Sequence, residues 1–150
     1  MDSPCLYTAP VRVIMQVLPI YCDCGITGFE SPSAEYREMG LSLDELLIKN
    51  PNATFIGLAS GDSMQKIGIF SGDLLIVDRA KEVKNGSVIV ANFNGNYICK
   101  ILDKKNNRLL SASDKHQPVY LTESDVFQLE GSVPISIRKH DETFNLLAFL

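Results

Sequence analysis

The sequence contains only two histidines, His116 and His140, and both lie in polar stretches. A Ser-His-Asp hydrolase uses a histidine between its nucleophile and a carboxylate, so a triad would rest on one of these two residues and has little support. A metal site is equally poorly supported. Cys22 and Cys24 form only a weak ligand pair, and both histidines are distant in sequence. We expect neither a metal nor another cofactor.

Clustered positive charge and long apolar runs are also missing. The formal net charge is -4, the sequence pI is near 5.1, and Lys and Arg are scattered. We therefore expect no direct nucleic-acid binding, and any connection with DNA would run through a partner protein. The apolar runs are far shorter than the roughly 20 residues of a membrane-spanning helix, and the N-terminus does not resemble a secretory signal. These features predict a cytoplasmic protein without membrane association.

The four cysteines fit either a reduced cytosolic chain or two disulfides. Cys99 lies within a strand-like run, and Cys22 and Cys24 are too close together for an easy bridge. Free thiols are therefore the favoured interpretation, in agreement with a cytoplasmic location.

The chain of 150 residues is long enough for one compact domain with a short arm. Residues 1–40 contain repeated prolines and glycines and no sustained periodicity, which predicts an extended N-terminal arm without room for a helix-turn-helix. Residues 41–140 are predicted to form a β domain, and residues 141–150 a C-terminal extension. The extension is interpreted as an edge strand or packed tail, or alternatively as a partner-binding peptide.

One short helix and a series of strands are predicted in the domain. Ser42 and Glu45 form a capping-box pattern before an apolar leucine face, and Asn50-Pro51 ends the helix. Strands are expected near residues 53–59, 73–78, 87–93, 96–103, 108–112, 119–121, 126–130 and 133–138. Asn94-Gly95 indicates a type I′ hairpin turn. The predicted fold is mostly β, an antiparallel sandwich or partial barrel with one or two short helices.

Two polar residues stand out because one follows an apolar run and the other lies inside one. Ser63 comes after the strand-like run 54–59, and Lys100 lies inside the run 97–102. Burial disfavours an ammonium group, so a buried Lys100 would shift toward the neutral amine, which can accept a serine hydroxyl proton. Together they would form a Ser-Lys nucleophile and base.

The residues alone leave simpler interpretations open. Gly61 and Ser63 are compatible with an ordinary turn, and Gln65 breaks the Gly-x-Ser-x-Gly pattern of α/β-hydrolases. Strand alternation places Lys100 on one face with Ile98 and Leu102. Its amine could also reach solvent along an edge strand.

Several ordered motifs carry a family resemblance. They are Ser60-Gly61-Asp62-Ser63-Met64, Gly72-Asp73-Leu74-Leu75-Ile76-Val77-Asp78, Gly86-Ser87-Val88-Ile89-Val90-Ala91 and Lys100, with Gly28-Phe29-Glu30-Ser31-Pro32-Ser33-Ala34-Glu35-Tyr36 and Leu46-Leu47-Ile48 upstream. In this order they resemble the LexA/UmuD self-cleaving serine peptidase family, and its UmuD branch more closely. The resemblance covers roughly residues 26–138.

The resemblance implies that Ser63 is the nucleophile, that Lys100 is the general base, and that backbone N–H groups of Ser63 and Met64 stabilise the oxyanion. Relatives cut a Cys-Gly or Ala-Gly bond immediately before the Gly-Phe-x-Ser-Pro stretch. That register gives Thr27-Gly28 in this chain, where threonine departs from the usual residue. Cys24-Gly25, three residues upstream, is the alternative bond.

The resemblance also implies the biological setting. It predicts an SOS-response protein that cuts its own arm under stimulation by a RecA filament on single-stranded DNA. The processed form would work as a homodimer and as accessory subunit of a UmuC-like Y-family error-prone DNA polymerase, with the sliding clamp as a further candidate partner. The alternative is a non-cleaving UmuD-like binding module that regulates the polymerase.

Overall fold

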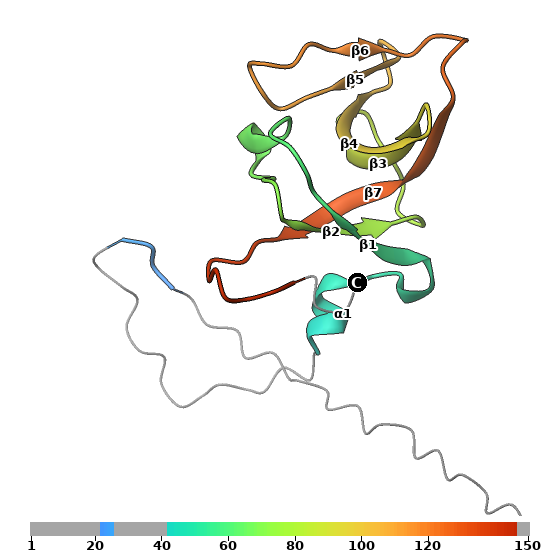
Figure 1. The fold of residues 1–150 in the computed structure, drawn as a ribbon. Helices are drawn as coiled ribbons and strands as arrows, with labels where there is room; N and C mark the ends of the chain where they lie inside the picture. Colours follow the sequence, from blue (N-terminus) through green and yellow to red (C-terminus); the bar gives the residue numbers. More distant parts are fainter. Residues whose placement is uncertain (1–21, 26–41, 147–150) are drawn as a thin grey trace, which may run out of the picture. The chain divides into compact units, whose positions relative to one another are not determined.

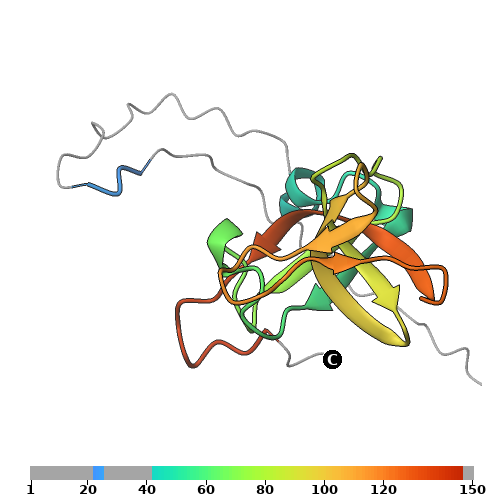
Figure 2. The same ribbon diagram turned by 90° about the horizontal axis from the view of Figure 1, so that it is seen from above.

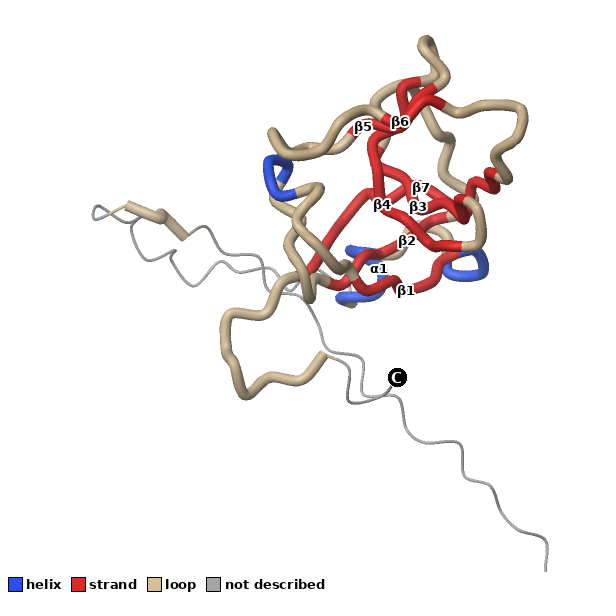
Figure 3. The backbone as a smooth tube through the Cα atoms, turned by 45° about the horizontal axis from the view of Figure 1, so that its top comes forward, coloured by secondary structure: helices blue, strands red, loops and turns tan. Residues whose placement is uncertain are grey.

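The computed structural model describes residues 22–25 and 42–146 of the chain. Within these residues, strands dominate and helices are short (Figure 3). The elements are α1 (Leu43–Leu47), η1 (Pro51–Ala53), β1 (Thr54–Leu58), η2 (Gln65–Ile67), β2 (Leu74–Asp78), β3 (Val88–Phe93), β4 (Asn96–Asp103), β5 (Arg108–Leu110), β6 (Val119–Tyr120) and β7 (Phe127–Ile137). No helix in this described part is long and apolar enough to cross a membrane.

All strands of the described residues belong to one antiparallel sheet. Its seven strands have the order β1-β2-β7-β3-β4-β5-β6, and they lie in a compact unit that begins at Leu47. Figure 1 shows the sheet bending strongly at β3 and β4 between the β1–β2 pair and the β5–β6 pair. The prediction of a mostly β, antiparallel fold is confirmed.

The two strands predicted at 126–130 and 133–138 are one strand, so that prediction is wrong. β7 runs without interruption from Phe127 to Ile137 and lies between β2 and β3 (Figure 2). Its register against β3 shifts where Val90 opposes Gly131 and Ala91 opposes Leu129, which is a β-bulge. A bulge bends a strand without ending it, so β7 first follows β3 and then continues along β2.

The two faces of the sheet carry separate apolar clusters. On one face the cluster includes Met64, Val77 and Val90, and on the other it includes Ile89 and Leu109. Along β4, Cys99 and Ile101 pack against the first cluster, and Ile98 and Leu102 belong with the second. The alternation predicted around Lys100 is therefore confirmed.

The predicted helix start and hairpin turn are also confirmed. The Glu45 main-chain N–H donates to Ser42 Oγ at 3.2 Å, which caps α1. Between β3 and β4, Asn94 and Gly95 have φ values of 50° and 88°, the left-handed pair that a type I′ turn requires. Glycine and asparagine adopt this conformation at low cost, so the pair fixes the β3–β4 register that places Lys100.

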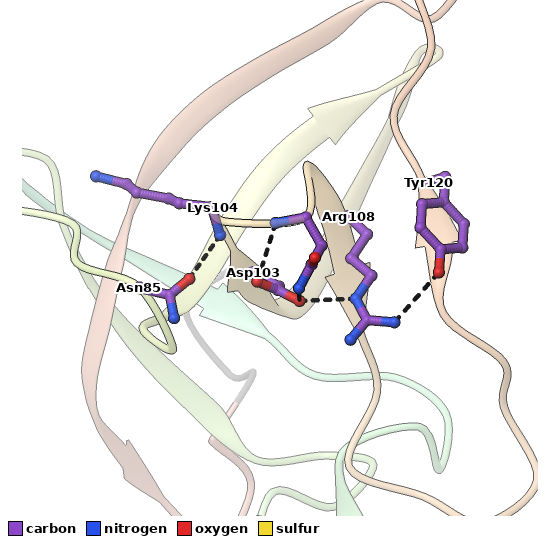
Figure 4. Close-up of polar contacts among 6 residues, drawn as sticks. Asn85, Asp103, Lys104, Arg108 and Tyr120 are labelled. Carbon is purple, nitrogen blue, oxygen red and sulfur yellow. Dashed lines mark hydrogen bonds and ion pairs between the residues drawn. The ribbon is translucent and has the colours of Figure 1, made fainter.

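The turn between β4 and β5 is held by a polar network around Asp103 (Figure 4). Asp103 is 7% exposed and accepts hydrogen bonds from Arg108 Nε at 2.7 Å and Asn106 Nδ2 at 2.8 Å. Arg108 Nη1 also donates to the Tyr120 hydroxyl at 3.3 Å, which ties β5 to β6. The network fixes β5 against β4, and with it the segment that follows β5.

A second buried carboxylate fixes the loop between η2 and β2. Asp73 is 2% exposed and accepts hydrogen bonds from Arg138 Nε at 2.9 Å and Nη2 at 2.8 Å, and from the Phe70 main-chain N–H at 2.9 Å. Arg138 also stacks over the Phe70 ring at 4.0 Å. The hydrogen bonds from Arg138 lower the pKa of Asp73 from its ordinary value of 3.8.

Replacing Arg138 with methionine is expected to lower the urea midpoint of unfolding at neutral pH. A depressed carboxylate pKa adds stability above the unfolded value, and this contribution is lost as the pH falls through the folded value. The difference between the wild type and Arg138→Met should therefore shrink below about pH 3.8. Lys66→Met is the control because it removes only an exposed ion pair with Asp114. A difference that stayed constant down to acid pH would contradict this role of Arg138.

Candidate active site

Ser63 lies in the loop between β1 and β2, directly before η2. The next residue, Met64, is 3% exposed and anchors the loop in the apolar core. Two main-chain hydrogen bonds hold the loop to the segment after β5. The Ala112 N–H donates to Ser63 O at 2.8 Å, and the Lys66 N–H donates to Ala112 O at 2.9 Å. The position of Ser63 is thus set by a buried side chain and a remote main-chain partner.

Lys100 lies on β4, which is an interior strand between β3 and β5. It therefore does not lie on an edge strand, contrary to one interpretation of the sequence. Its opposite residue on β3 is the fully buried Ile89. Lys100 is half-buried, and its Nζ donates a hydrogen bond to Ser111 Oγ at 2.8 Å.

Ser63 and Lys100 line the same cleft, whose volume is about 700 Å³. Most of the lining is apolar and comes from β1, β3 and β4 and the loop that contains Ser63. The lining residues are Phe55, Ile56, Gly57, Leu58, Ala59, Ser60, Gly61, Ser63, Met64, Ile69, Leu75, Arg79, Val90, Tyr97, Ile98, Cys99 and Lys100. A cleft of this size and composition can accept an extended peptide segment.

The surroundings of Lys100 favour its neutral form. Burial lowers the pKa of Lys100, because desolvation penalises the ammonium, and the nearby Asp62 and Cys99 oppose this shift. Burial also raises the pKa of the Cys99 thiol to about 11. Cys99 is therefore protonated at neutral pH and has little nucleophilic character.

The main-chain N–H groups of Ser63 and Met64 are candidate hydrogen-bond donors to a bound substrate. Among the described residues, neither group donates a hydrogen bond, although Met64 O accepts from Ile67 and Ile69. Main-chain N–H groups beside a nucleophile are the usual donors of an oxyanion hole.

The comparison with known proteins decides the family. Residues 19–134 match the family described as Peptidase S24-like. The chain is a UmuD-like member of this family. SamA of Salmonella typhimurium LT2 is 34% identical over 92% of this chain and 98% of its own length. MucA of Escherichia coli is 33% identical over 82% of this chain and 86% of its own length, and ImpA of Escherichia coli is 41% identical over 57% and 59%.

Of the two bonds that the S24-like resemblance suggests for cleavage, only one is described. Thr27 and Gly28 lie outside the described residues. Cys24 and Gly25 are exposed, and the Gly25 N–H donates to Asp23 Oδ1 at 2.9 Å. Cys22, Cys24 and Cys99 carry free thiols, as the cysteine pattern predicts for these three residues.

His116 contacts Asp62, the residue before the candidate nucleophile. His116 Nε2 lies 3.4 Å from Asp62 Oδ1, and its Nδ1 lies 3.0 Å from Ser113 Oγ. Within the described ranges it has no hydrogen bond to Ser63. The same ranges contain no group of three or more side chains that could hold a metal ion.

Ser111 is the site residue that the sequence analysis missed. A signal lies in the strand register: Ile101 opposes Leu110, the last residue of β5, and the same register continued by one residue would bring Ser111 opposite Lys100. The predicted strand at 108–112 contains Ser111, but none of the motifs that carry the family resemblance includes this residue.

Proposed function

We propose that this S24-like chain is an SOS-response serine peptidase that cuts its own N-terminal arm with Ser63 as nucleophile and Lys100 as general base. The observation that carries the proposal is that both side chains line one cleft, where burial lowers the pKa of the lysine. A lysine base works when it is neutral and close to the hydroxyl that it deprotonates.

The chemistry follows the Ser-Lys variant of acyl transfer. Neutral Lys100 takes the Ser63 hydroxyl proton while Ser63 Oγ bonds to the carbonyl carbon of the scissile peptide. The Ser63 and Met64 N–H groups stabilise the resulting oxyanion. The C–N bond then breaks, the lysine returns its proton to the leaving nitrogen, and water hydrolyses the ester on Ser63.

The favoured substrate is the Thr27-Gly28 bond of the arm, with Cys24-Gly25 as the alternative. Family register and the distance along the chain to Ser63 support Thr27-Gly28. Cutting at Gly25 would shift the arm by three residues and move Phe29 and Pro32 out of their expected subsites. The Cys24-Gly25 bond is exposed in the structure, so accessibility does not exclude it.

The UmuD-like family membership supports a proposal for the wider function. The processed form is proposed to work as a homodimer and as accessory subunit of a UmuC-like Y-family translesion polymerase. A RecA filament on single-stranded DNA would stimulate cleavage by promoting entry of the arm into the cleft. Filling an apolar cleft completes the burial of Lys100, which favours the neutral base. The extension at residues 141–150 is a candidate contact for the polymerase or the sliding clamp.

Self-cleavage of the purified protein is expected to accelerate with pH. Only neutral Lys100 accepts the proton, so the rate should rise about tenfold per pH unit and level off above the lysine's lowered pKa. RecA, single-stranded DNA and a nucleotide should give the same product at neutral pH. The measurement is the first-order rate of appearance of a shortened form, and no shortened form under either condition would contradict the proposal.

N-terminal sequencing of the product identifies the bond. A product that begins at Gly28 supports the favoured register, and one that begins at Gly25 supports the alternative. Replacing Gly28 with valine should block the first cut, and replacing Gly25 with valine should leave it intact. The reverse pattern would assign the cut to Cys24-Gly25.

The second candidate is a non-cleaving UmuD-like module that only regulates the polymerase. One observation favours it: among the described residues, Lys100 Nζ makes no hydrogen bond to Ser63. Thr27, which stands where relatives have Cys or Ala, also favours this alternative. Under this alternative, wild type and Ser63→Ala would be equally resistant to processing.

A further inference from the structure

The segment Ser111-Ala112 contacts both members of the proposed dyad. The Ser111 hydroxyl accepts the hydrogen bond from Lys100 Nζ at 2.8 Å. The next residue, Ala112, is 8% exposed, and its main chain bonds Ser63 O at 2.8 Å and the Lys66 N–H at 2.9 Å. Two adjacent residues therefore join the loop of the nucleophile to the side chain of the base.

This contact has a geometric cause. β4 and β5 pair with Ile101 opposite Leu110 and Leu102 opposite Leu109, and Ser111 directly follows the last paired residue, where the continued register would face Lys100. Opposite residues of an antiparallel pair point to the same face. The Asp103 network fixes this pairing at the turn, and a half-buried hydroxyl therefore faces the amine.

The amine needs such a partner because its surroundings are apolar. Ile98 and Leu102 flank Lys100 on its own face, and Ile89 lies opposite on β3. A flexible four-carbon side chain has many rotamers, and partial burial removes some of the water that would otherwise hydrate the amine. Of the described side chains, Ser111 supplies the hydrogen bond that Lys100 makes, so it selects one position for Nζ.

We propose that Ser111 is a positioning residue, whose hydroxyl holds the Lys100 amine in place while Ala112 holds the loop of Ser63. The inference rests on the proposed self-cleavage and deepens it. Ser111 acts on the base and does not touch the scissile bond. The hydroxyl fixes one N–H direction of the amine, and the second N–H and the lone pair of the neutral form then share the two remaining directions.

Removing the hydroxyl has two separable consequences. Lys100 becomes less well placed, so the plateau rate at high pH, where all of the lysine is neutral, should fall about tenfold. The ammonium also loses a charge-assisted hydrogen bond, so the midpoint of the pH profile should move to lower pH. Asp62 and Cys99 are the other titratable groups that act on Lys100, and both remain in the variant. The two effects oppose each other near neutral pH, so the complete profile is needed.

The test compares Ser111→Ala, Ser111→Thr and Ser113→Ala across the pH profile of self-cleavage. Ser111→Thr keeps a hydroxyl and should recover most of the plateau rate. Ser113→Ala removes a hydroxyl two residues away that contacts His116, and it should match the wild type. An unchanged plateau and midpoint in Ser111→Ala, or equal effects of Ser111→Ala and Ser113→Ala, would overturn the inference.

A second measurement does not depend on cleavage. In a Ser63→Ala background, the Lys100 titration is followed by NMR of the isotope-labelled lysine side chain, with and without Ser111→Ala. A downward shift of the Lys100 midpoint supports the contact even where the wild type does not cut itself. An unshifted midpoint in a folded variant contradicts it. Absence of cleavage in the wild type, by contrast, counts against the proposed function alone.

Discussion

Ser63→Ala is expected to abolish self-cleavage, and Lys100→Met to reduce it by about 10²–10⁴-fold. Alanine removes the only atom that attacks the peptide in the proposed mechanism. Methionine keeps much of the lysine volume in the apolar surroundings of β4 and removes the group that accepts the proton. Both variants should keep the folded structure, because Ser63 is joined to Ala112 through its main chain and Met64 carries the buried anchor.

Lys66→Met is the matched control for the lysine. Lys66 lies three residues from Ser63, but its exposed amine pairs with Asp114 and does not line the cleft. We expect it to cleave at the wild-type rate, as measured by the first-order appearance of the shortened form at several pH values. A Lys100→Met protein that kept the rate and pH dependence of the wild type would remove Lys100 from the mechanism.

Gly131→Ala is expected to lower the free energy of unfolding by about 2–3 kcal/mol. A Cβ at this position would lie 2.8 Å from Val77 Cγ1 and 2.9 Å from Asp78 O. Val77 is fully buried and Asp78 contributes main-chain atoms, so neither can move aside cheaply. Gly131 lies at the bulge where β7 passes from β3 to β2, and the added methyl would force these strands apart.

Gly57→Ala is the control for Gly131. Gly57 lies on β1, and a Cβ there would find ordinary contacts at 3.7 Å and 3.8 Å to Leu75 and Val77. Urea unfolding should show little loss for this variant and a clearly lower midpoint for Gly131→Ala. Equal midpoints for the two variants would show that the close approach at Gly131 does not affect the stability of the fold.

Much of the fold follows from local sequence signals. Asn94-Gly95 defines a hairpin because both residues adopt positive φ, and Ser42 defines a helix start because its hydroxyl accepts a main-chain N–H. These signals act between residues close in the chain. The continuity of β7 does not follow from such a signal, because the bulge at Gly131 is imposed by pairing with both β2 and β3.

The candidate site also combines residues that local sequence signals predict with one residue that only long-range strand pairing identifies. Ser63 and Lys100 stand out in the sequence by motif and by a charge within an apolar run. Ser111 does not, since a serine after a strand of three residues is common, and only the β4–β5 register brings it to Lys100. The burial that lowers the pKa of Lys100 also depends on β4 being an interior strand, which the apolar run alone could not establish.

The place of β7 in the sheet has a consequence for the order of events during synthesis. In the described part of the chain, β2 and β3 do not pair with each other, and β7, the last described strand, is inserted between them. Until residue 137 has left the ribosome, no strand pairing among the described residues joins the β1–β2 hairpin, which contains Ser63, to the group of β3 to β6, which contains Lys100. In an emerging chain, the contacts of the Ser111-Ala112 segment would therefore have to hold Ser63 near Lys100 without support from β7. Under the proposed mechanism, we therefore expect efficient self-cleavage of the arm only after β7 has been translated and has paired with both β2 and β3.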